Sequence, residues 1–188
     1  GDGADIAICQ SVAGVNFLDV VYRRGSYKEP NMPFIPGREA SGAVLAVGEG
    51  VTDFKVGDRV AYSMAPASYA EYAVVPAARL VNLPDNVDSK SGCAIMQQGL
   101  SAHYLSHSCF PLKPGHKALV HAGAGGVGLL LTQLAKKLGA TVYTTVSSEA
   151  KAELSRAAGA DASIIYTKQD FEVEVKRLTD GRGVDVVY

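Results

Sequence analysis

Apolar and polar residues alternate in short runs along the first half of the chain. These runs occupy residues 4–10, 43–47, 59–62 and 69–75, and Gly, Pro and Asp residues separate them. Alternation with a period of two residues is typical of strands that bury one face. The polar stretch 85–91, directly after Pro84, closes this region. The pattern therefore predicts a mostly β domain over residues 1–98.

From about Gly99 the pattern changes to apolar runs that alternate with longer runs of helical period. The runs expected to be strands are 118–121, 141–146, 162–166 and 184–188, and those expected to be helices are 127–138, 150–158 and 170–178. Gly139 and Gly159 stand where two of these helices should end, as glycine commonly does. Alternating β and α units predict a parallel sheet wound with helices over residues 99–188.

The sharpest motif follows the first strand of this second region. Gly123, Gly125 and Gly128 have G-x-G-x-x-G spacing and stand between the apolar run and the first helical run. In a dinucleotide-binding turn, the first glycine makes the tight turn, the second admits the phosphates, and the third lets helix and strand pack closely. The amides at the helix start then bind the anion. Because strand, glycines, helix and next strand come in this order, the segment predicts a dinucleotide site rather than a bare glycine-rich turn.

The end of the next strand indicates which dinucleotide is bound. NAD-specific folds usually carry Asp or Glu there to bond the ribose 2′-hydroxyl, but Val146 or Ser147 holds that position here. Ser147 and Ser148 can donate to a 2′-phosphate, and Lys151 adds a positive charge. Glu149 lies between them, but at a helix start its side chain can point away. We therefore expect NADP(H), with a merely solvated Lys151 as the alternative.

Composition narrows the classes of function. Of the 188 residues 47% are hydrophobic and 20% charged, and the formal net charge is −1. These values are typical of soluble globular proteins and give no basic surface for nucleic acid or a membrane. Cys9, Cys93 and Cys109 are odd in number and widely spaced, which favours a reducing compartment. The expected location is cytoplasmic. Because the first residues read as a turn entering a strand, the sequence leaves open whether a targeting segment precedes them.

Several motifs together resemble one family. They are Gly14-Val-Asn-Phe-Leu-Asp19, Arg24-Gly-Ser-Tyr27, Phe34-Ile-Pro-Gly-Arg-Glu-Ala-Ser-Gly42, Val47-Gly48, Gly57-Asp-Arg-Val60, Ala70-Glu-Tyr72 and the glycine turn. Across the chain they resemble the quinone oxidoreductase (zeta-crystallin-like) branch of the medium-chain dehydrogenase/reductases. The resemblance implies a GroES-like β-rich domain, N-terminally truncated here, followed by the first half of a Rossmann doubly wound parallel sheet. We therefore expect a fragment, because the complete Rossmann fold needs about six strands.

The resemblance also implies which residues bind the cofactor. Asn16 corresponds to a family asparagine beside the nicotinamide, and Ser101 to a hydroxyl residue that contacts the cofactor. Gly126 and Val127 match the backbone that holds the pyrophosphate. The remaining expected residues, which surround the adenosine phosphate, are Ser147, Lys151 and Tyr166.

On the substrate side the resemblance is less complete. Tyr27 occupies a motif position near the substrate cleft. A tyrosine usual in this branch, five residues after the asparagine, is replaced by Val21, and Tyr22 stands beside it. Unless Tyr22 takes its place, the acceptor pocket differs and a preference for quinones stays open.

The same comparison argues against a metal. Zinc alcohol dehydrogenases of the wider superfamily carry Gly-His-Glu, whose histidine binds the catalytic zinc, where this chain has Gly-Arg38-Glu. A guanidinium cannot ligate Zn²⁺. The usual cysteine ligands correspond to Asn16 and, with looser alignment, Gln97. His103 and His107 have helical i, i+4 spacing, but such a pair is more often packed or solvated structure. We expect no metal.

Without a metal, the chemistry must rely on an acceptor that takes hydride readily, because the cofactor supplies the hard step. The first expectation is NADPH-dependent reduction of quinones by hydride or electron transfer. The alternatives are zinc-free reduction of α,β-unsaturated ketones or aldehydes, and a non-catalytic crystallin-like or RNA-binding role, for which the composition gives little support. No catalytic proton donor is assigned. For the full-length protein the resemblance suggests a homodimer, joined through a part of the sheet outside this chain.

Overall fold

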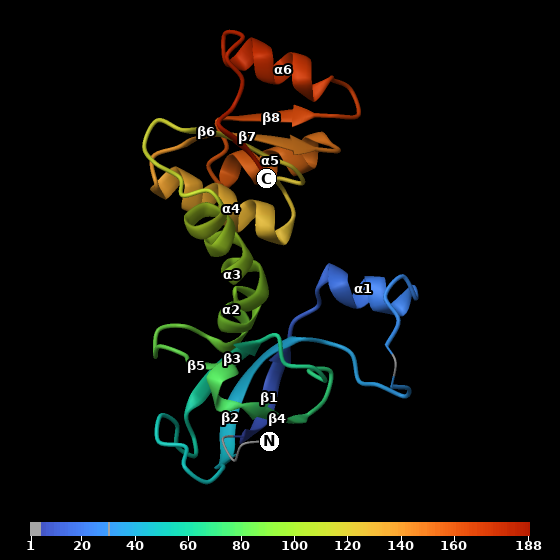
Figure 1. The fold of residues 1–188 in the computed structure, drawn as a ribbon, viewed down its shortest axis with the longest axis vertical. Helices are drawn as coiled ribbons and strands as arrows, with labels where there is room; N and C mark the ends of the chain where they lie inside the picture. Colours follow the sequence, from blue (N-terminus) through green and yellow to red (C-terminus); the bar gives the residue numbers. More distant parts are fainter. Residues whose placement is uncertain (1–4, 30) are drawn as a thin grey trace. The chain divides into compact units, whose positions relative to one another are not determined.

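The computed structural model describes residues 5–29 and 31–188. The chain divides into two compact units, Gly1–Gln97 and Gln98–Tyr188. Figure 1 shows the β-rich first unit in blue to green and the mixed α/β second unit in yellow to red. The predicted fold class, a β-rich region followed by a parallel sheet wound with helices, is confirmed.

Five antiparallel strands form the sheet of the first unit. They are β1 (Asp5–Ala13), β2 (Glu39–Val47), β3 (Arg59–Ser63), β4 (Tyr72–Pro76) and β5 (Leu80–Asn82), in the order β4-β1-β2-β3-β5. Gly42 of β2 approaches β1 so closely that a Cβ there would lie 2.1 Å from the carbonyl oxygen of Cys9. Alternate side chains such as Ile6, Ile8 and Val60 build one buried cluster around Tyr62.

Short helices flank this sheet, and the alternating pattern did not predict them. They are α1 (Phe17–Arg23), the 3₁₀ turn η1 (Ala77–Arg79), α2 (Ser89–Ala94) and α3 (Met96–Tyr104), which continues into the second unit. Local polar bonds begin two of them: Asp19 accepts from the Asn16 amide at 2.9 Å, and Asp88 accepts from the Ser91 amide at 2.9 Å. Helices of six to nine residues show too little of the 3.6-residue period to be recognised in sequence.

Of the eight predicted strands only 141–146 keeps its predicted bounds, and three of the others differ as follows. Strand β2 begins at Glu39 rather than at residue 43. The start was not predicted because the first four residues of the strand are all buried, so the alternation that marks a strand is missing there. The predicted strand 69–75 begins only at Tyr72, since the Tyr69 amide bonds Pro36 in a loop at 3.1 Å. The last strand, predicted over 184–188, is β9 (Val186–Val187).

Four parallel strands form the sheet of the second unit. They are β6 (Lys117–Val120), β7 (Thr141–Val146), β8 (Ala162–Ile165) and β9, in the order β8-β7-β6-β9. The connecting helices are α4 (Gly126–Lys137), α5 (Glu149–Ala157) and α6 (Phe171–Leu178), and a π-helical turn, η2 (Leu105–Cys109), follows α3. Strands β7 and β8 extend the sheet to one side of β6 and β9 pairs on its other side. Ligands bind at such a reversal, beyond the carboxyl ends of the strands.

Alternate residues of β6 face opposite sides of this sheet. Ala118 and Val120 pack in the cluster that contains Leu131 of α4, whereas Leu119 packs with Val175 of α6. This alternation is the two-residue period of a strand that is buried on both faces. Helix α6 accordingly lies on the opposite side of the sheet from α4 (Figure 1).

Candidate functional site

The glycine turn joins β6 to α4 at the carboxyl edge of the parallel sheet. Its left-handed residue is Ala122, with φ of 52°, and the Gly125 amide closes the turn by donating to the Ala122 carbonyl at 2.7 Å. The Gly123 amide donates to the Thr145 carbonyl at 3.0 Å and so ties the turn to β7. The tight turn expected at the first glycine is therefore made by the residue before it.

The three glycines of the motif have different surroundings. A Cβ on Gly123 would lie 2.4 Å from the Cβ of Thr144, and one on Gly128 would lie 2.4 Å from the Ala122 carbonyl oxygen. A Cβ on Gly125 would meet only Ala122, at 3.1 Å or more. The first and third glycines thus let parts of the protein pack together, while the second leaves open space beside the backbone, where a phosphate can approach.

The start of α4 is suited to an anion. The helix has 12 residues, its N-cap is Gly125, and no side chain caps it. Its first intrahelical bond, from the Leu129 amide to the Gly125 carbonyl at 2.9 Å, leaves the earlier amides without a helical acceptor. These amides, which include Gly126 and Val127, carry the positive end of the helix dipole.

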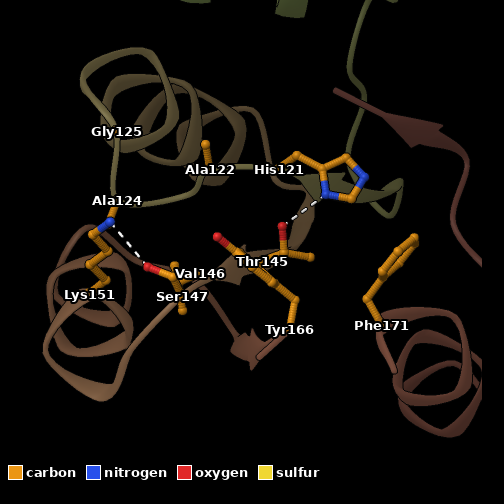
Figure 2. Close-up of a pocket in the computed structure, with 10 residues that line it drawn as sticks. All are labelled: His121, Ala122, Ala124, Gly125, Thr145, Val146, Ser147, Lys151, Tyr166 and Phe171. Carbon is orange, nitrogen blue, oxygen red and sulfur yellow. Dashed lines mark hydrogen bonds between the residues drawn. The ribbon is translucent and has the colours of Figure 1, made fainter. Parts of the chain in front are cut away.

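A cavity of about 530 Å³ opens beside this turn, at the ends of β6, β7 and β8. It is lined by His121, Ala122, Ala124, Gly125, Thr145, Val146, Ser147, Lys151, Tyr166 and Phe171. Figure 2 shows Ser147 and Lys151 on one side of it, with the Lys151 Nζ donating to the Ser147 Oγ at 3.1 Å. This side offers a cation and a hydroxyl to an anionic group.

The carboxylate nearest to these residues in sequence is engaged elsewhere. Glu149, the first residue of α5, pairs with Arg156 at 2.6 Å and is not among the residues that line the cavity. Ser148 is the N-cap of α5 and accepts from the Lys151 amide at 3.4 Å. Ser147 is thus free to face the cavity while Ser148 starts the helix.

The other side of the cavity is aromatic, and no motif in the sequence indicated His121 or Phe171. The His121 Nδ1 and the Thr145 Oγ1 are 2.8 Å apart, and the His121 ring meets the Phe171 ring edge-on, with centroids 5.2 Å apart (Figure 2). His121 directly follows β6, and Phe171 begins α6, at the carboxyl edge of the sheet. That position, where ligands of such sheets bind, was the available signal.

A second cavity, of about 270 Å³, lies on the β9 side of the same turn. Its lining comprises Leu105, Val120, His121, Ala122, Gly125, Gly126, Val127, Gly128, Leu131 and Tyr188. Gly125 therefore borders both cavities, one on each side of the sheet reversal. Gly123, Ser148 and Ser101, all three predicted to bind the cofactor, are not among the lining residues of either cavity.

In the first unit, Asn16 lies in a cluster of buried polar groups. Its Nδ2 donates to the Glu39 Oε1 at 2.7 Å, and the Gln97 amide donates to the Glu39 Oε2 at 2.8 Å. Asn16, Asp19 and Glu39 are 7%, 9% and 1% exposed. Gly14 makes room for this carboxylate, since a Cβ there would lie 2.1 Å from the Glu39 Oε1.

Burial and this acidic cluster change two neighbouring titrations. Burial, together with the hydrogen bond from its hydroxyl to Asp19 at 2.9 Å, raises the pKa of Tyr69 to about 12. Burial, with the Glu39 charge nearby, raises the pKa of the Cys93 thiol to about 11. Both groups are therefore protonated at neutral pH.

A cavity of about 550 Å³ lies beside this cluster, within the first unit. Its lining comprises Val15, Asp19, Val20, Tyr22, Arg23, Met32, Phe34, Pro36 and Tyr69. The Arg38 Nη2 donates to the Tyr22 hydroxyl at 3.0 Å. Tyr27 is 57% exposed and packs edge-on against Tyr22, with ring centroids 5.8 Å apart, so it reaches this cavity only through Tyr22.

Neither a metal centre nor a membrane span emerges from the part of the chain that the structure describes. Within residues 5–29 and 31–188, His, Cys, Asp and Glu side chains form no group of three or more that could hold a metal ion. Among the same residues, the helices are too short or too polar for any of them to cross a bilayer.

Two family models match the chain. One, described as the alcohol dehydrogenase GroES-like domain, matches residues 2–85, and the other, described as zinc-binding dehydrogenase, matches residues 126–188.

Similar proteins extend these matches along nearly the whole chain. A quinone oxidoreductase of Pseudomonas aeruginosa is 43% identical over 185 residues, which are 98% of this chain and 57% of that protein. A 2-haloacrylate reductase of Burkholderia sp. is 41% identical, over 97% of this chain and 57% of that protein. The solved Escherichia coli quinone oxidoreductase in complex with NADPH is 37% identical, with a TM-score of 0.96, over 99% of this chain and 57% of that one. The chain thus spans little more than half the length of these relatives.

Proposed function

Because this chain belongs to the quinone oxidoreductase branch of the medium-chain dehydrogenase/reductases, we propose that it carries the NADPH-binding turn and an acceptor-side unit of a zinc-free quinone reductase. Membership confirms the resemblance drawn from the sequence motifs. The activity itself is a proposal, because the chain spans only 57% of the length of the Pseudomonas aeruginosa relative.

The observation that carries the proposal is the Ser147–Lys151 pair at the end of β7. Lys151 Nζ bonds the Ser147 Oγ at 3.1 Å at the cavity wall, and the Glu149 carboxylate is drawn to Arg156. A 2′-phosphate gains two charge-assisted hydrogen bonds from this arrangement, whereas a 2′-hydroxyl finds no carboxylate to accept from it. The NADPH complex of the similar Escherichia coli enzyme supports the same cofactor.

The glycine turn fits the pyrophosphate of that cofactor. The open space beside Gly125 and the amides at the start of α4 would hold the phosphates, and Tyr166 would lie against the adenosine side. We further propose that the two cavities flanking Gly125 take the two halves of the dinucleotide. When bound, NADPH supplies a hydride at its nicotinamide, and the protein contributes orientation and hydrogen bonds.

In the first unit, Glu39 orients the side-chain amide of Asn16, and Arg38 orients the hydroxyl of Tyr22. Since a carboxylate only accepts, Glu39 must face the Asn16 Nδ2. The Asn16 Oδ1 accepts from the Asp19 amide in the capping box of α1, and its second lone pair is left for a ligand's donor. We propose that this oxygen accepts from the nicotinamide carboxamide. The Tyr22 oxygen accepts from Arg38, so the hydrogen of the Tyr22 hydroxyl stays available to donate.

The cavity beside Tyr22 suits a flat, conjugated acceptor. Most of its lining is apolar or aromatic, including Phe34 and Met32, and few polar groups face it. A quinone buries its ring in such a pocket and offers carbonyl oxygens to a donor such as the Tyr22 hydroxyl. Tyr22 then takes the role of the family tyrosine that Val21 replaces, which supports quinones as acceptors.

The donor set supports a reaction without zinc. Arg38 stands at the position of the histidine ligand of the zinc enzymes and binds Tyr22, and Asn16 stands at a cysteine position and binds Glu39. Neither a guanidinium nor an amide nitrogen with its hydrogens is a zinc ligand. We expect metal analysis of the purified full-length protein to find less than stoichiometric zinc, and activity to survive a chelator.

The direct test compares NADPH and NADH in the full-length protein with 1,2-naphthoquinone as acceptor. We expect kcat/KM to favour NADPH clearly, and Lys151→Ala to remove most of that preference by raising KM for NADPH alone. A wild-type preference for NADH would overturn the cofactor assignment. Failure of any quinone to oxidise bound NADPH would overturn the assigned reaction.

Reduction of activated alkenes is the second candidate, because the Burkholderia 2-haloacrylate reductase is 41% identical to this chain. Its substrate class carries a carboxylate, which a cavity with Arg23 at its wall could pair. Parallel assays with 2-chloroacrylate, an enone and 1,2-naphthoquinone separate the two reactions. An Arg23→Met variant should lose activity on the acrylate only.

The cellular location is a further part of the proposal. All three cysteines, Cys9, Cys93 and Cys109, are free thiols. Free thiols in an enzyme of this kind support the cytoplasm, where thiols stay reduced. Fractionation of cells expressing the full-length protein tests this.

A further inference from the structure

The cavity of the first unit has one hydroxyl hydrogen at its wall that no protein group accepts. Tyr22 lines this cavity and is half-buried, and its oxygen accepts from the Arg38 Nη2 at 3.0 Å. Among the residues that the structure describes, none accepts a hydrogen bond from the Tyr22 hydroxyl. Because polar hydrogens in such surroundings normally find an acceptor, water or a ligand in the cavity must supply it.

Three neighbours hold the Tyr22 side chain in place. The Tyr27 ring meets it edge-on with centroids 5.8 Å apart, and the Phe34 ring lies 6.0 Å away at an interplanar angle of 56°. The Arg38 guanidinium lies 5.4 Å from the centroid of the Tyr22 ring, within the range of a cation–π contact. The Tyr22 hydroxyl therefore has a fixed position at the cavity wall.

Arg38 brings a positive charge that has no carboxylate partner. Its side chain is half-buried, and within residues 5–29 and 31–188 it belongs to none of the ion pairs. A charge that leaves water is normally paired, so negative charge on the Tyr22 oxygen would supply the missing partner. The bond from Arg38 also polarises the Tyr22 hydroxyl and makes it a stronger donor.

The other polar side chains at this wall do not offer a proton. The Asp19 Oδ2 accepts both from the Asn16 amide and from the Tyr69 hydroxyl, each at 2.9 Å. The Tyr69 hydrogen is engaged in that bond, and burial with this bond raises the pKa of Tyr69 to about 12. A guanidinium such as that of Arg23 keeps its proton in proteins. Among the described lining residues, Tyr22 is thus the one with a transferable proton.

We propose that Tyr22 donates the proton that completes reduction of the acceptor, and that Arg38 positions Tyr22 and stabilises the tyrosinate left behind. The inference rests on the proposed quinone reduction and deepens it. The quinone gains an electron pair with the hydride from NADPH and is left with a negative charge on one oxygen. The Tyr22 O–H bond breaks, an O–H bond forms on the acceptor, and the electron pair of the broken bond stays on the Tyr22 oxygen. A proton from water then restores Tyr22.

The first test measures binding without reaction, on the full-length protein in the absence of NADPH. The probe is 4-nitrophenolate, an anionic phenolate like the reduced acceptor, and its visible absorbance changes when a donor bonds its oxygen. We expect Tyr22→Phe to bind it about tenfold more weakly than the wild type. Arg38→Met should also weaken it, and Arg38→Lys should weaken it less. Unchanged affinity in Tyr22→Phe would overturn the inference, because the hydroxyl would then not face the ligand.

The second test follows a single turnover of bound NADPH with 1,2-naphthoquinone by stopped flow. Tyr22→Phe should slow NADPH oxidation about a hundredfold, and the rate should then rise with the concentration of imidazolium buffer, which replaces the lost acid. NADPH affinity, measured by calorimetry, should stay as in the wild type. A merely structural role of Tyr22 would not create this dependence on buffer acid, so a slow variant without it would overturn the inference.

Further variants assign the effect to the Arg38–Tyr22 pair. Adding Arg38→Met to Tyr22→Phe should slow the reaction no further, since Arg38 acts through Tyr22. Tyr72→Phe is the matched control and should react as the wild type does, because Tyr72 lies on β4 of the same unit, is 63% exposed and does not line the cavity. Tyr27→Phe keeps the ring that packs on Tyr22. A loss as large as that of Tyr22→Phe would give the proton to Tyr27, and the inference would fall.

Failure of this inference is distinguishable from failure of the proposed function. A wild type that reduces no quinone would refute the proposed reaction, and the proton step with it. An active wild type with an equally active Tyr22→Phe variant would refute the proton step alone. The NADPH preference assigned to Lys151 is measured independently, because Tyr22→Phe should leave the ratio of NADPH to NADH affinity as it is.

Discussion

The two units of the chain both arrange polar groups beside a cavity, but they satisfy those groups in opposite ways. In the first unit, Asn16, Asp19 and Glu39 are at least nine-tenths buried and bond one another or nearby backbone. In the second unit, Lys151 and Tyr166 are exposed, and the Lys151 Nζ donates at 3.1 Å to the Oγ of half-buried Ser147 on the same side of the cavity.

This difference teaches where a substitution should act. A buried group that already has its partners is part of the folding free energy, because removing it leaves a donor or acceptor without water or protein to bond. An exposed group beside a cavity has little to lose on folding and gains its partner from the ligand. Changes in the first unit should therefore lower stability, and changes around the second unit's cavity should lower affinity.

The largest expected effect on stability is that of Glu39→Ala. It leaves the Asn16 Nδ2 and the Gln97 amide without their acceptor, and each unpaired buried donor costs about 1–3 kcal/mol. We expect the free energy of unfolding to fall by about 3 kcal/mol in urea titrations of the full-length protein. Glu39→Gln, which keeps one acceptor oxygen, should lose less. A loss below about 1 kcal/mol for Glu39→Ala would show that water reaches this cluster and would end the contrast between the units.

A pair of glycines brings the contrast inside the second unit. Gly128→Ala forces a Cβ to 2.4 Å from the Ala122 carbonyl, and we expect the free energy of unfolding to fall by about 2 kcal/mol. Gly125→Ala meets nothing nearer than 3.1 Å, so we expect it to leave stability nearly unchanged while NADPH binding is lost. Urea unfolding and calorimetry on both variants check this. Equal losses of stability would mean that Gly125, too, serves packing.

The same two glycines show how far sequence carries the site. Their spacing predicted the turn, and the order of strand, turn and helix predicted the parallel sheet, because those features are local and periodic. The sequence could not reveal that Ala122 adopts the left-handed conformation. Nor could it reveal that Gly123 is needed against Thr144, because that contact depends on how closely β7 approaches the turn. Packing distances of this kind have no sequence period.

The first unit was harder to predict for a related reason. Helix α1 forms around a bond between Asp19 and the Asn16 amide rather than along an apolar stripe, and β2 begins within a fully buried stretch that shows no alternation. His121 and Phe171 were missed because they lie 50 residues apart and meet only when β6 and α6 reach one edge of the sheet. Roles inferred for Asn16, Ser101 and Tyr27 stay predictions until binding is measured.

Alkaline pH should destabilise the first unit more than the second, although burial also raises the pKa of Tyr143 and of Tyr188 in the second unit. Burial raises the pKa of Tyr62 from 10.0 to about 12, and burial also raises that of Cys93 from 9.0 to about 11. The unfolded state therefore loses the Tyr62 and Cys93 protons at a lower pH than the folded state does. Their contribution to the free energy of unfolding is fully present below about pH 9 and is lost as the pH rises to 12. One such group contributes up to about 1.4 kcal/mol per pH unit.

Urea unfolding at half-unit steps from pH 8 to 11 measures that slope. Tyr62→Phe removes the titrating hydroxyl and should flatten the slope above pH 10, at the cost of the hydrogen bond to Gln10. The matched change in the second unit is Tyr143→Phe, where burial also raises the pKa of the hydroxyl, and it should flatten the slope less. Equal flattening by both variants would contradict a greater alkaline lability of the first unit.

The smallest expected effect concerns the exposed ion pair that draws Glu149 away from the cavity. Exposed pairs contribute about 0–1 kcal/mol, so Arg156→Ala should change the free energy of unfolding very little. The freed Glu149 carboxylate would then compete for Lys151, and we expect NADPH to bind about two- to threefold more weakly while NADH binds as before. Arg177→Ala, which breaks the Arg177–Glu174 pair outside the cavity, is the control and should change neither affinity.

A shift of this size that vanished in high salt would show that an exposed charge in the second unit acts on the ligand alone, since screening removes such effects. A measurable loss of stability in Arg156→Ala would instead give this surface pair the structural role that the buried groups of the first unit have.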